Sequence, residues 1–171
     1  MNIMAGKRLS LRILSGLLLL PLLAGCSDEQ SVLTKGQALP AFTLERLEGG
    51  VFNFPADLQG KVVAIRFWAD WCPFCKTEMR DIEPIYRQYR DRGLVILAVN
   101  VRQDRATAER FIRKLQISYE VLLDIEGKVA RSYGVSGLPT TFIADRAGRL
   151  QTRILGESTP ELFEKIIQGL L

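Results

Sequence analysis

Two cysteines three positions apart, Cys72 and Cys75, are the residues of this chain best suited to chemistry. They follow an apolar run, 62–65, and open a segment with helical spacing. Residues i and i+3 share one face of a helix, so the two sulfurs are able to form a small disulfide. Unpaired N–H groups and the dipole at a helix start favour a thiolate on Cys72, and Pro73 suits the first helical position. A stabilised, partly exposed thiolate beside a second thiol is what thiol–disulfide exchange requires.

Tryptophans flank the cysteine pair. Trp68 and Trp71 are the only two in the chain. Trp68 lies in the apolar run, where a core position and a site position are equally consistent with the sequence. Trp71 directly precedes Cys72, and we interpret it as a wall of the site.

Two motifs carry a family resemblance. Segment 67–76, Phe-Trp-Ala-Asp-Trp-Cys-Pro-Phe-Cys-Lys, resembles the active-site segment of the thioredoxin superfamily. Together with 60–63, Gly-Lys-Val-Val, it resembles the extracytoplasmic TlpA/ResA-type thiol–disulfide oxidoreductases. Segment 137–142, Gly-Leu-Pro-Thr-Thr-Phe, resembles the cis-proline segment that lies opposite the cysteines in such folds.

The resemblance covers residues 39–171 and implies an α/β, thioredoxin-like fold. It implies a central mixed β-sheet flanked by helices, with an N-terminal β-hairpin and an inserted helix. It also implies that Cys72 attacks a partner, that Cys75 resolves the mixed disulfide, and that this redox-active disulfide is the only cofactor. The residues expected to bind the partner are Trp71, Pro73, Phe74, Leu138 and Pro139. A cis bond before Pro139 would free the backbone of Leu138 to pair with an extended peptide.

Two charged residues near the motif need separate treatment. The superfamily often has a buried Asp six positions before the first cysteine, and this chain has Arg66 there. We predict that Arg66 turns to the surface; the alternative is that it raises the local positive potential around the cysteines. Glu78 matches an acidic position of TlpA/ResA-type proteins and is the candidate to relay the proton of Cys75. The alternative for Glu78 is a solvated helix carboxylate paired with Lys or Arg.

Composition excludes several classes of function. There is no histidine, which removes His bases, His metal ligands and Cys–His protease chemistry. Of 23 basic residues, Lys7, Arg8 and Arg12 precede residue 26, so the remaining 20 nearly balance 19 acidic residues. A near-neutral domain gives no electrostatic support for nucleic-acid binding. Two cysteines fill only half of a zinc site, so no metal site is expected.

The first residues read as a targeting segment. Residues 1–25 combine a basic start with an apolar stretch, which predicts a signal peptide. Segment 23–26, Leu-Ala-Gly-Cys, resembles the bacterial lipobox, which implies that Cys26 carries a lipid; an ordinary secretory signal is the alternative. Residues 26–38 are predicted to be a polar tether and 39–171 the folded domain. We expect a lipid-anchored protein on the periplasmic side of the cell envelope, with Ser27 favouring the outer over the inner membrane.

The elements that must position the cysteines follow from hydrophobic periodicity. A hairpin is expected at 42–54, a buried strand at 62–68, and a helix from Cys72 to about Arg92 that is kinked at Pro84. The remaining expected elements are a strand at 94–101, a helix capped by Asp104, a strand at 119–123, a helix at 126–133, a hairpin at 141–155 and a helix starting at 158–161. Alternation of strands and helices predicts a sheet with parallel pairings.

The sequence thus predicts a membrane-anchored thiol–disulfide oxidoreductase, and the resemblance to the TlpA/ResA group implies that it reduces disulfides of extracytoplasmic proteins. The resemblance implies a membrane electron donor of the DsbD/CcdA type. An oxidant or isomerase with the same site is the first alternative, disfavoured because Phe74 replaces the His of DsbA-type oxidants. A redoxin-type peroxidase is disfavoured because 66–72 lacks the Pro and Thr of that class. A metal-binding module or a structural disulfide is the remaining alternative.

Overall fold

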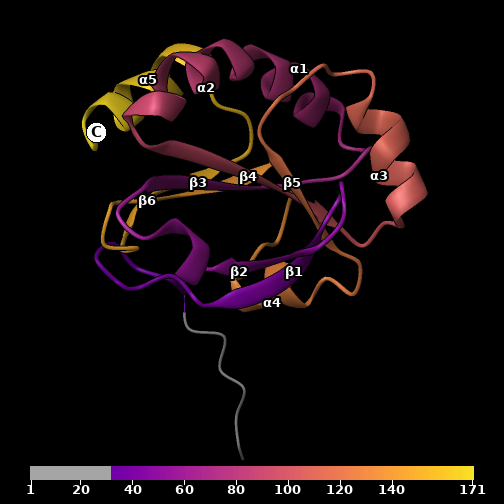
Figure 1. Cartoon of the computed structure of the whole chain (residues 1–171), viewed down its shortest axis with the longest axis horizontal. Helices are drawn as coiled ribbons and strands as arrows, with labels where there is room; N and C mark the ends of the chain where they lie inside the picture. Colours follow the sequence, from indigo (N-terminus) through magenta and orange to yellow (C-terminus); the bar gives the residue numbers. More distant parts are fainter. Residues whose placement is uncertain (1–31) are drawn as a thin grey trace, which may run out of the picture.

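The computed structural model describes residues 32–171 (Figure 1). The predicted signal peptide, Cys26 and residues 27–31 of the predicted tether lie outside the described residues. Within residues 32–171, no helix combines the length and the apolar character needed to cross a membrane.

A mixed seven-stranded sheet forms the centre of the molecule, in the order β2-β1-β5-β4-β3-β6-β7. The strands are β1 (Phe42–Arg46), β2 (Val51–Phe54), β3 (Val62–Trp68), β4 (Leu94–Val101), β5 (Glu120–Asp124), β6 (Thr140–Ala144) and β7 (Leu150–Leu155). Strand β4 pairs in parallel with β3 and β5, and every other pairing is antiparallel. The central strand β3 is buried along its whole length, as expected for a strand covered on both faces.

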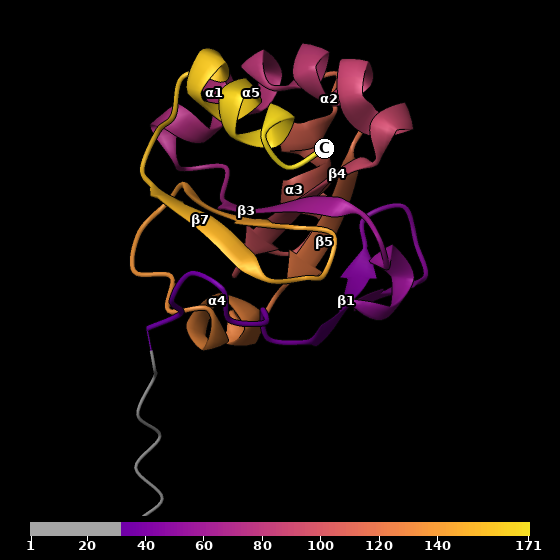
Figure 2. The same ribbon diagram turned by 90° about the vertical axis from the view of Figure 1, so that its left-hand side faces the viewer.

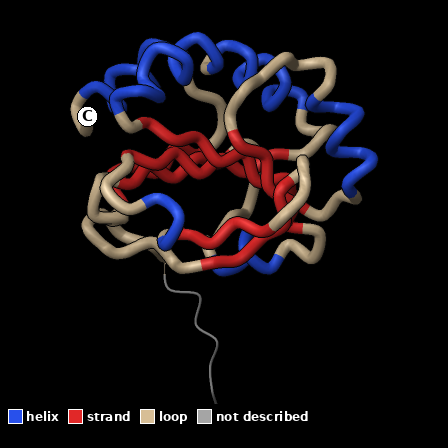
Figure 3. The backbone as a smooth tube through the Cα atoms, in the orientation of Figure 1, coloured by secondary structure: helices blue, strands red, loops and turns tan. Residues whose placement is uncertain are grey.

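Helices cover both faces of this sheet (Figures 2 and 3). They are α1 (Pro73–Asp81), α2 (Glu83–Tyr89), α3 (Arg105–Ile112), α4 (Lys128–Ser132) and α5 (Pro160–Gln168), with 3-10 turns η1 (Ala56–Leu58) and η2 (Arg90–Arg92). Alternate residues of β3 divide the core in two. Val62, Ala64 and Trp68 face the cluster that contains α1, α2, α3 and α5. Val63 and Ile65 face the cluster that contains α4 and the phenylalanines of the hairpin.

The thioredoxin-like α/β fold predicted from the sequence is confirmed, with its mixed sheet flanked by helices and its N-terminal hairpin of β1 and β2. The helix predicted from Cys72 to Arg92 is not continuous. It divides at Ile82 into α1 and α2, and Pro84 lies in the first turn of α2. Proline lacks the N–H for an i→i−4 bond and its ring clashes with the preceding turn, which explains a break rather than a gentle kink.

The first described residues are fastened to one end of the sheet. Gly36 N donates to Leu150 O at 2.7 Å and Leu39 N donates to Gly148 O at 3.1 Å. These partners lie at the β6–β7 turn, next to the start of β3, because Val63 pairs with Ala144 at the end of β6. The chain therefore enters the domain at the sheet edge opposite the end of β3.

Candidate active site

Cys72 and Cys75 lie at the junction between the end of β3 and the start of α1. Cys72 is the N-cap of α1, with an extended backbone, and Pro73 is its first residue, as predicted. The two cysteines form a disulfide, and their Cα atoms are 5.4 Å apart. Cys75 is fully buried and Cys72 is only 2% exposed. The expectation of a partly exposed Cys72 is therefore wrong for the disulfide form, because the N-cap position packs the residue into the core cluster beneath α1.

The loop before Cys72 is fixed by a residue that the sequence reasoning missed. Gln103 Oε1 accepts a hydrogen bond from Asp70 N at 2.9 Å, and Gln103 Nε2 donates to the Asp70 carboxylate. Asn100, buried at the end of β4, donates to the same Gln103 oxygen. The neighbouring Trp71 is 68% exposed, so its ring borders the site from solvent. A long-range partner such as Gln103 leaves no local sequence signal.

The predicted cis-proline segment lies at the same sheet edge as the cysteines. The Leu138–Pro139 peptide bond is cis. Strand β6 begins directly after it, and Thr140 pairs with Phe67 near the end of β3. Thr140 Oγ1 donates to Gly137 O at 2.7 Å, which stabilises the turn. Cys72 and Pro139 therefore both flank the end of the β3–β6 pair.

Exposed apolar side chains surround this edge. Phe74, between the cysteines, is 54% exposed, and Pro73 is also exposed. Leu155, at the end of β7, is exposed and pairs with Thr140 next to the cis-proline. Leu155 was not predicted as a site residue, because its separation from the cysteines in sequence hides its position.

A groove of about 300 Å³ opens beside Trp71 and Leu138. The loop after β4, at Arg102, and helix α4, at Arg131, provide its other walls. Trp71 and Leu138, both predicted to contact a partner, thus line one surface.

A buried ion pair lies under α1. Arg66 is fully buried, and its Nη2 pairs with Oε2 of Glu78, which is 2% exposed. Ser158, before α5, donates to Glu78 Oε1 from its backbone N at 3.1 Å and from its hydroxyl at 2.7 Å. The prediction that Arg66 turns to the surface is wrong: position 66 faces the helices on a strand with no exposed side. The alternative that Glu78 is a solvated carboxylate is wrong as well, because its side chain is buried; the basic partner which that alternative expected is present as Arg66.

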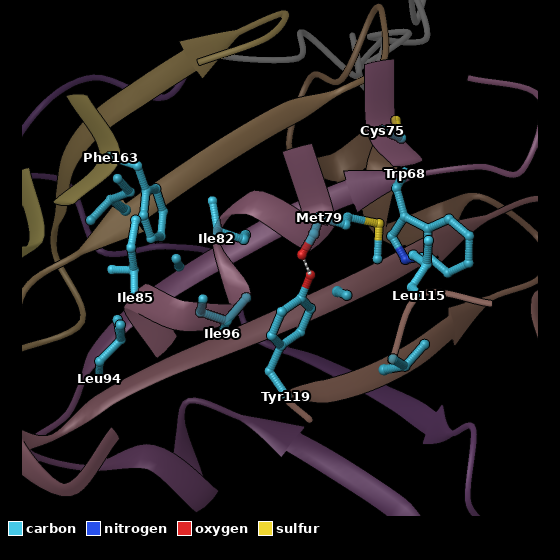
Figure 4. Packing of buried hydrophobic residues seen from close by; sticks show 14 of the residues in the cluster. Trp68, Cys75, Met79, Ile82, Ile85, Leu94, Ile96, Leu115, Tyr119 and Phe163 are labelled. Carbon is cyan, nitrogen blue, oxygen red and sulfur yellow. Dashed lines mark hydrogen bonds between the residues drawn. The ribbon is translucent and has the colours of Figure 1, made fainter. Parts of the chain in front are cut away.

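The core beneath the site is apolar (Figure 4). Trp68 is fully buried and stacks on Phe111 of α3 with ring centroids 4.9 Å apart, which settles its position in the core. Met79 packs against this cluster, and its carbonyl accepts a hydrogen bond from Tyr119 Oη at 2.7 Å. Helix α1 is thus anchored behind the disulfide by packing and by this hydrogen bond.

This arrangement is suited to two-electron exchange between dithiol and disulfide. Its features are a helix-start cysteine, a second cysteine one turn later, an edge rich in exposed apolar groups, and a buried carboxylate behind the pair. In residues 32–171, no cluster of three or more acidic or Cys side chains is arranged to hold a metal ion.

Comparison with known proteins identifies the family of the chain. The AhpC/TSA family model matches residues 35–153. The thiol–disulfide oxidoreductase ResA of Geobacillus thermodenitrificans is 32% identical over 169 residues, which cover 96% of this chain and 97% of ResA. ResA of Bacillus anthracis is 32% identical over 160 residues, covering 94% and 92% of the two chains.

Solved structures give the same result. A proposed thiol:disulfide interchange protein DsbE from Chlorobium tepidum superposes with a TM-score of 0.75 at 30% identity, covering 81% of this chain and 99% of that one. DsbF of Mycobacterium tuberculosis shares the fold, with a TM-score of 0.70 at 22% identity, covering 76% of this chain and 95% of that one. The chain belongs to the AhpC/TSA family of thioredoxin-like proteins and is a thiol–disulfide oxidoreductase related to ResA.

Proposed function

We propose that this oxidoreductase works as a reductant of disulfides in extracytoplasmic proteins. The observation that carries the proposal is a Cys72–Cys75 pair at the start of α1, on the sheet edge shared with Leu138 and Pro139. Exposed apolar side chains around this edge provide a surface for a partner polypeptide.

Each residue has a role in the cycle. The Cys72 thiolate attacks a partner disulfide, releasing one partner thiolate and forming a mixed disulfide. The Cys75 thiol then loses its proton to Glu78, attacks Cys72 and releases the second partner thiolate. The protein disulfide that results is reduced by a separate donor. Trp71, Pro73, Phe74, Leu138 and Pro139 hold the partner chain during these steps.

The proposed setting is the cell envelope. A lipid on Cys26 and a tether over 26–38 would hold the domain at a membrane surface on the periplasmic side, with the outer membrane favoured. A membrane thiol donor of the DsbD/CcdA type would supply electrons. Labelling with a radioactive fatty acid in cells tests the anchor, because a Cys26→Ser variant loses the label if Cys26 is lipidated.

The reduction potential of the Cys72–Cys75 pair tests the direction. Equilibration of the domain against glutathione or dithiothreitol buffers, followed by Trp fluorescence, measures it. Thioredoxin lies near about −270 mV and the oxidant DsbA near about −120 mV. We expect a value below about −220 mV on this scale. A value above about −150 mV would instead identify an oxidant or isomerase.

Trapping tests the roles of the two cysteines. A Cys75→Ser protein is expected to accumulate a mixed disulfide between Cys72 and its partner, because no second thiol resolves it. A Cys72→Ser protein is expected to trap nothing. Equal trapping by both variants would overturn the assignment of Cys72 as the attacking residue.

A further inference from the structure

The buried pair of Arg66 and Glu78 is not explained by exchange between two cysteines alone. We propose that Arg66 is a positioning residue that keeps Glu78 ionised behind Cys75, so that the carboxylate is ready to take the proton of the resolving thiol. This inference rests on the proposed function and deepens it by naming what prepares the proton acceptor.

The positions of the three residues bring them to one place. Cys75 and Glu78 are one turn apart on α1, and both are buried, so they share the face of the helix that packs on the sheet. Arg66 lies between Ala64 and Trp68 on the side of β3 that faces α1, and it reaches Glu78 directly. The guanidinium is therefore held below the helix turn that follows Cys75.

A buried carboxylate needs such partners to stay charged. Burial without partners favours the protonated form, whereas an opposite charge and hydrogen bonds to the carboxylate favour the ionised form. Glu78 has both, from Arg66 on one oxygen and from Ser158 on the other. Burial lowers the pKa of Arg66 to about 10, so the guanidinium remains positive at neutral pH.

The geometry leaves donor capacity on Arg66. Its Nε and Nη1 have no hydrogen-bond partner among the described residues, although they are buried. A buried arginine that only pairs with one carboxylate contributes little to stability, because the free energy of desolvating the two charges offsets much of their electrostatic attraction. A role that requires a charged acid at this place accounts for retaining the pair.

Other polar groups near the pair do not replace this role. Tyr119 is close enough to Arg66 to influence it electrostatically, but burial raises the pKa of the Tyr119 hydroxyl, which stays neutral and donates to Met79 O. Glu157 also attracts Arg66 electrostatically, yet it is exposed. Ser158, before α5, contacts Glu78 directly but carries no charge.

The step affected is the resolution of the mixed disulfide. The proton of Cys75 passes to Glu78, the Cys75 sulfur bonds to Cys72, and the bond between Cys72 and the partner sulfur breaks. The partner leaves as a thiolate, and two electrons have passed from the dithiol to the partner disulfide. If Glu78 is already protonated, this route is closed and the step slows.

Stopped-flow reaction of the reduced domain with dithiobis-nitrobenzoate, an aromatic disulfide with a coloured thiolate product, isolates this step. Attack by Cys72 releases the first thiolate, at a rate that depends on reagent concentration. Resolution by Cys75 releases the second, at a rate that does not. The pH profile of the second phase is the readout, and a merely structural residue would not move its midpoint.

Arg66→Met is expected to move that midpoint to higher pH. With the cation removed, Glu78 binds its proton more tightly, so the second phase slows at neutral pH and recovers at alkaline pH. Below the midpoint, the rate falls about tenfold each time the midpoint rises by one on the pH scale. Arg66→Lys retains the charge and is expected to keep the profile close to that of the parent protein.

The chain offers a matched control. Glu83, on α2, is also buried, accepts hydrogen bonds from Ser118 N and Oγ, and pairs with Arg87. Glu83→Gln removes a similar cluster away from the cysteines, so it is expected to leave the second-phase profile unchanged. If Glu83→Gln shifted the midpoint of the second phase as far as Arg66→Met does, the inference would be overturned.

Two further variants separate the possible failures. Arg66→Met/Glu78→Gln leaves no unpaired buried charge and is expected to fold at least as well as Arg66→Met, while its second phase stays slow. If Glu78→Gln slows the second phase but Arg66→Met leaves the profile unmoved, the positioning role of Arg66 is wrong and the base role of Glu78 stands. If Glu78→Gln has no effect, the proposed proton transfer itself is wrong.

Discussion

At the scale of single residues, Tyr119 shows how a distant side chain completes the helix behind the disulfide. Met79 lies in the last turn of α1, where backbone carbonyls lack partners within the helix. The Tyr119 hydroxyl, 40 positions away in sequence, supplies the partner for the Met79 carbonyl.

We expect Tyr119→Phe to destabilise the domain by about 1 kcal/mol, because the buried Met79 carbonyl loses this side-chain donor. Urea unfolding followed by Trp fluorescence measures the change. Tyr133→Phe is the comparison, since its hydroxyl donates to Pro40 O at 2.7 Å on the other face of the sheet. An unchanged unfolding midpoint for Tyr119→Phe would show that water replaces the hydroxyl without cost.

The exposed aromatic side chains lead to a prediction about partners. Trp71 and Phe74 are more than half exposed, so replacing either by Ser should change the free energy of unfolding by less than about 0.5 kcal/mol. We expect slower reduction of a protein disulfide, seen as a raised KM, with an unchanged rate towards a small aromatic disulfide. Equal slowing towards both substrates would place these side chains in the chemistry rather than in binding.

The cysteine pair and the cis-proline could be predicted from the sequence, but the residues that support them in the fold could not. Cys72, Cys75 and Pro139 lie in short motifs with a local physical meaning, and the structure places them at one sheet edge. Arg66 was misassigned because its partner Glu78 lies on another element, where Ser158 also reaches it from far along the sequence. Gln103 was missed for the same reason. Whether a charged side chain is buried depends on which helices and strands pack together. The hydrophobic periodicity of one segment does not indicate which other segments pack against it.

At the scale of elements, periodicity was a good guide because each strand and helix has a clear buried side. The strand predicted at 94–101 is β4, and the cap predicted at Asp104 accepts a hydrogen bond from Thr107 N at 2.7 Å. The break at Ile82 and the short α4 were less well predicted. Proline signals a disturbance without fixing its form, and α4 begins only at Lys128 because Gly127 adopts a positive φ before it.

Helix α5 offers a test of capping at the element next to the buried pair. Thr159 is its N-cap, and the hydroxyl accepts a hydrogen bond from Leu162 N at 3.3 Å. Thr159→Ala is expected to destabilise the domain by about 1 kcal/mol. Thermal unfolding measures the effect. Thr159→Ser retains the cap and should unfold like the parent; similar losses in both variants would contradict a capping role.

At the scale of the whole molecule, redox state and stability are linked. A disulfide that is hard to reduce is one whose closed form is stabilised by folding, and about 30 mV corresponds to about 1.4 kcal/mol. If the domain is a reductant, the disulfide form should unfold at a higher urea concentration than the dithiol form. A more stable dithiol form would point to an oxidant, and it should coincide with a high measured potential.

The segment 156–158 contacts both the cis-proline turn and the buried ion pair. Gly156 N donates to Pro139 O at 2.9 Å, and Ser158, two residues on, holds Glu78. The cis-proline turn and the buried Glu78 carboxylate are therefore supported by the same short segment, 156–158.

The attachment of the first described residues has a practical consequence. Gly36 and Leu39 are bound at the β6–β7 turn, whereas Cys72 follows the far end of β3, about 20 Å away along a seven-residue strand. An acyl chain, a resin or a fused protein attached ahead of residue 32 is therefore joined to the domain at the end of the sheet opposite the cysteines. The sheet edge that carries Cys72 and Cys75 then faces away from the attachment point, so immobilisation through the N-terminus should present the disulfide to a protein in solution without a spacer.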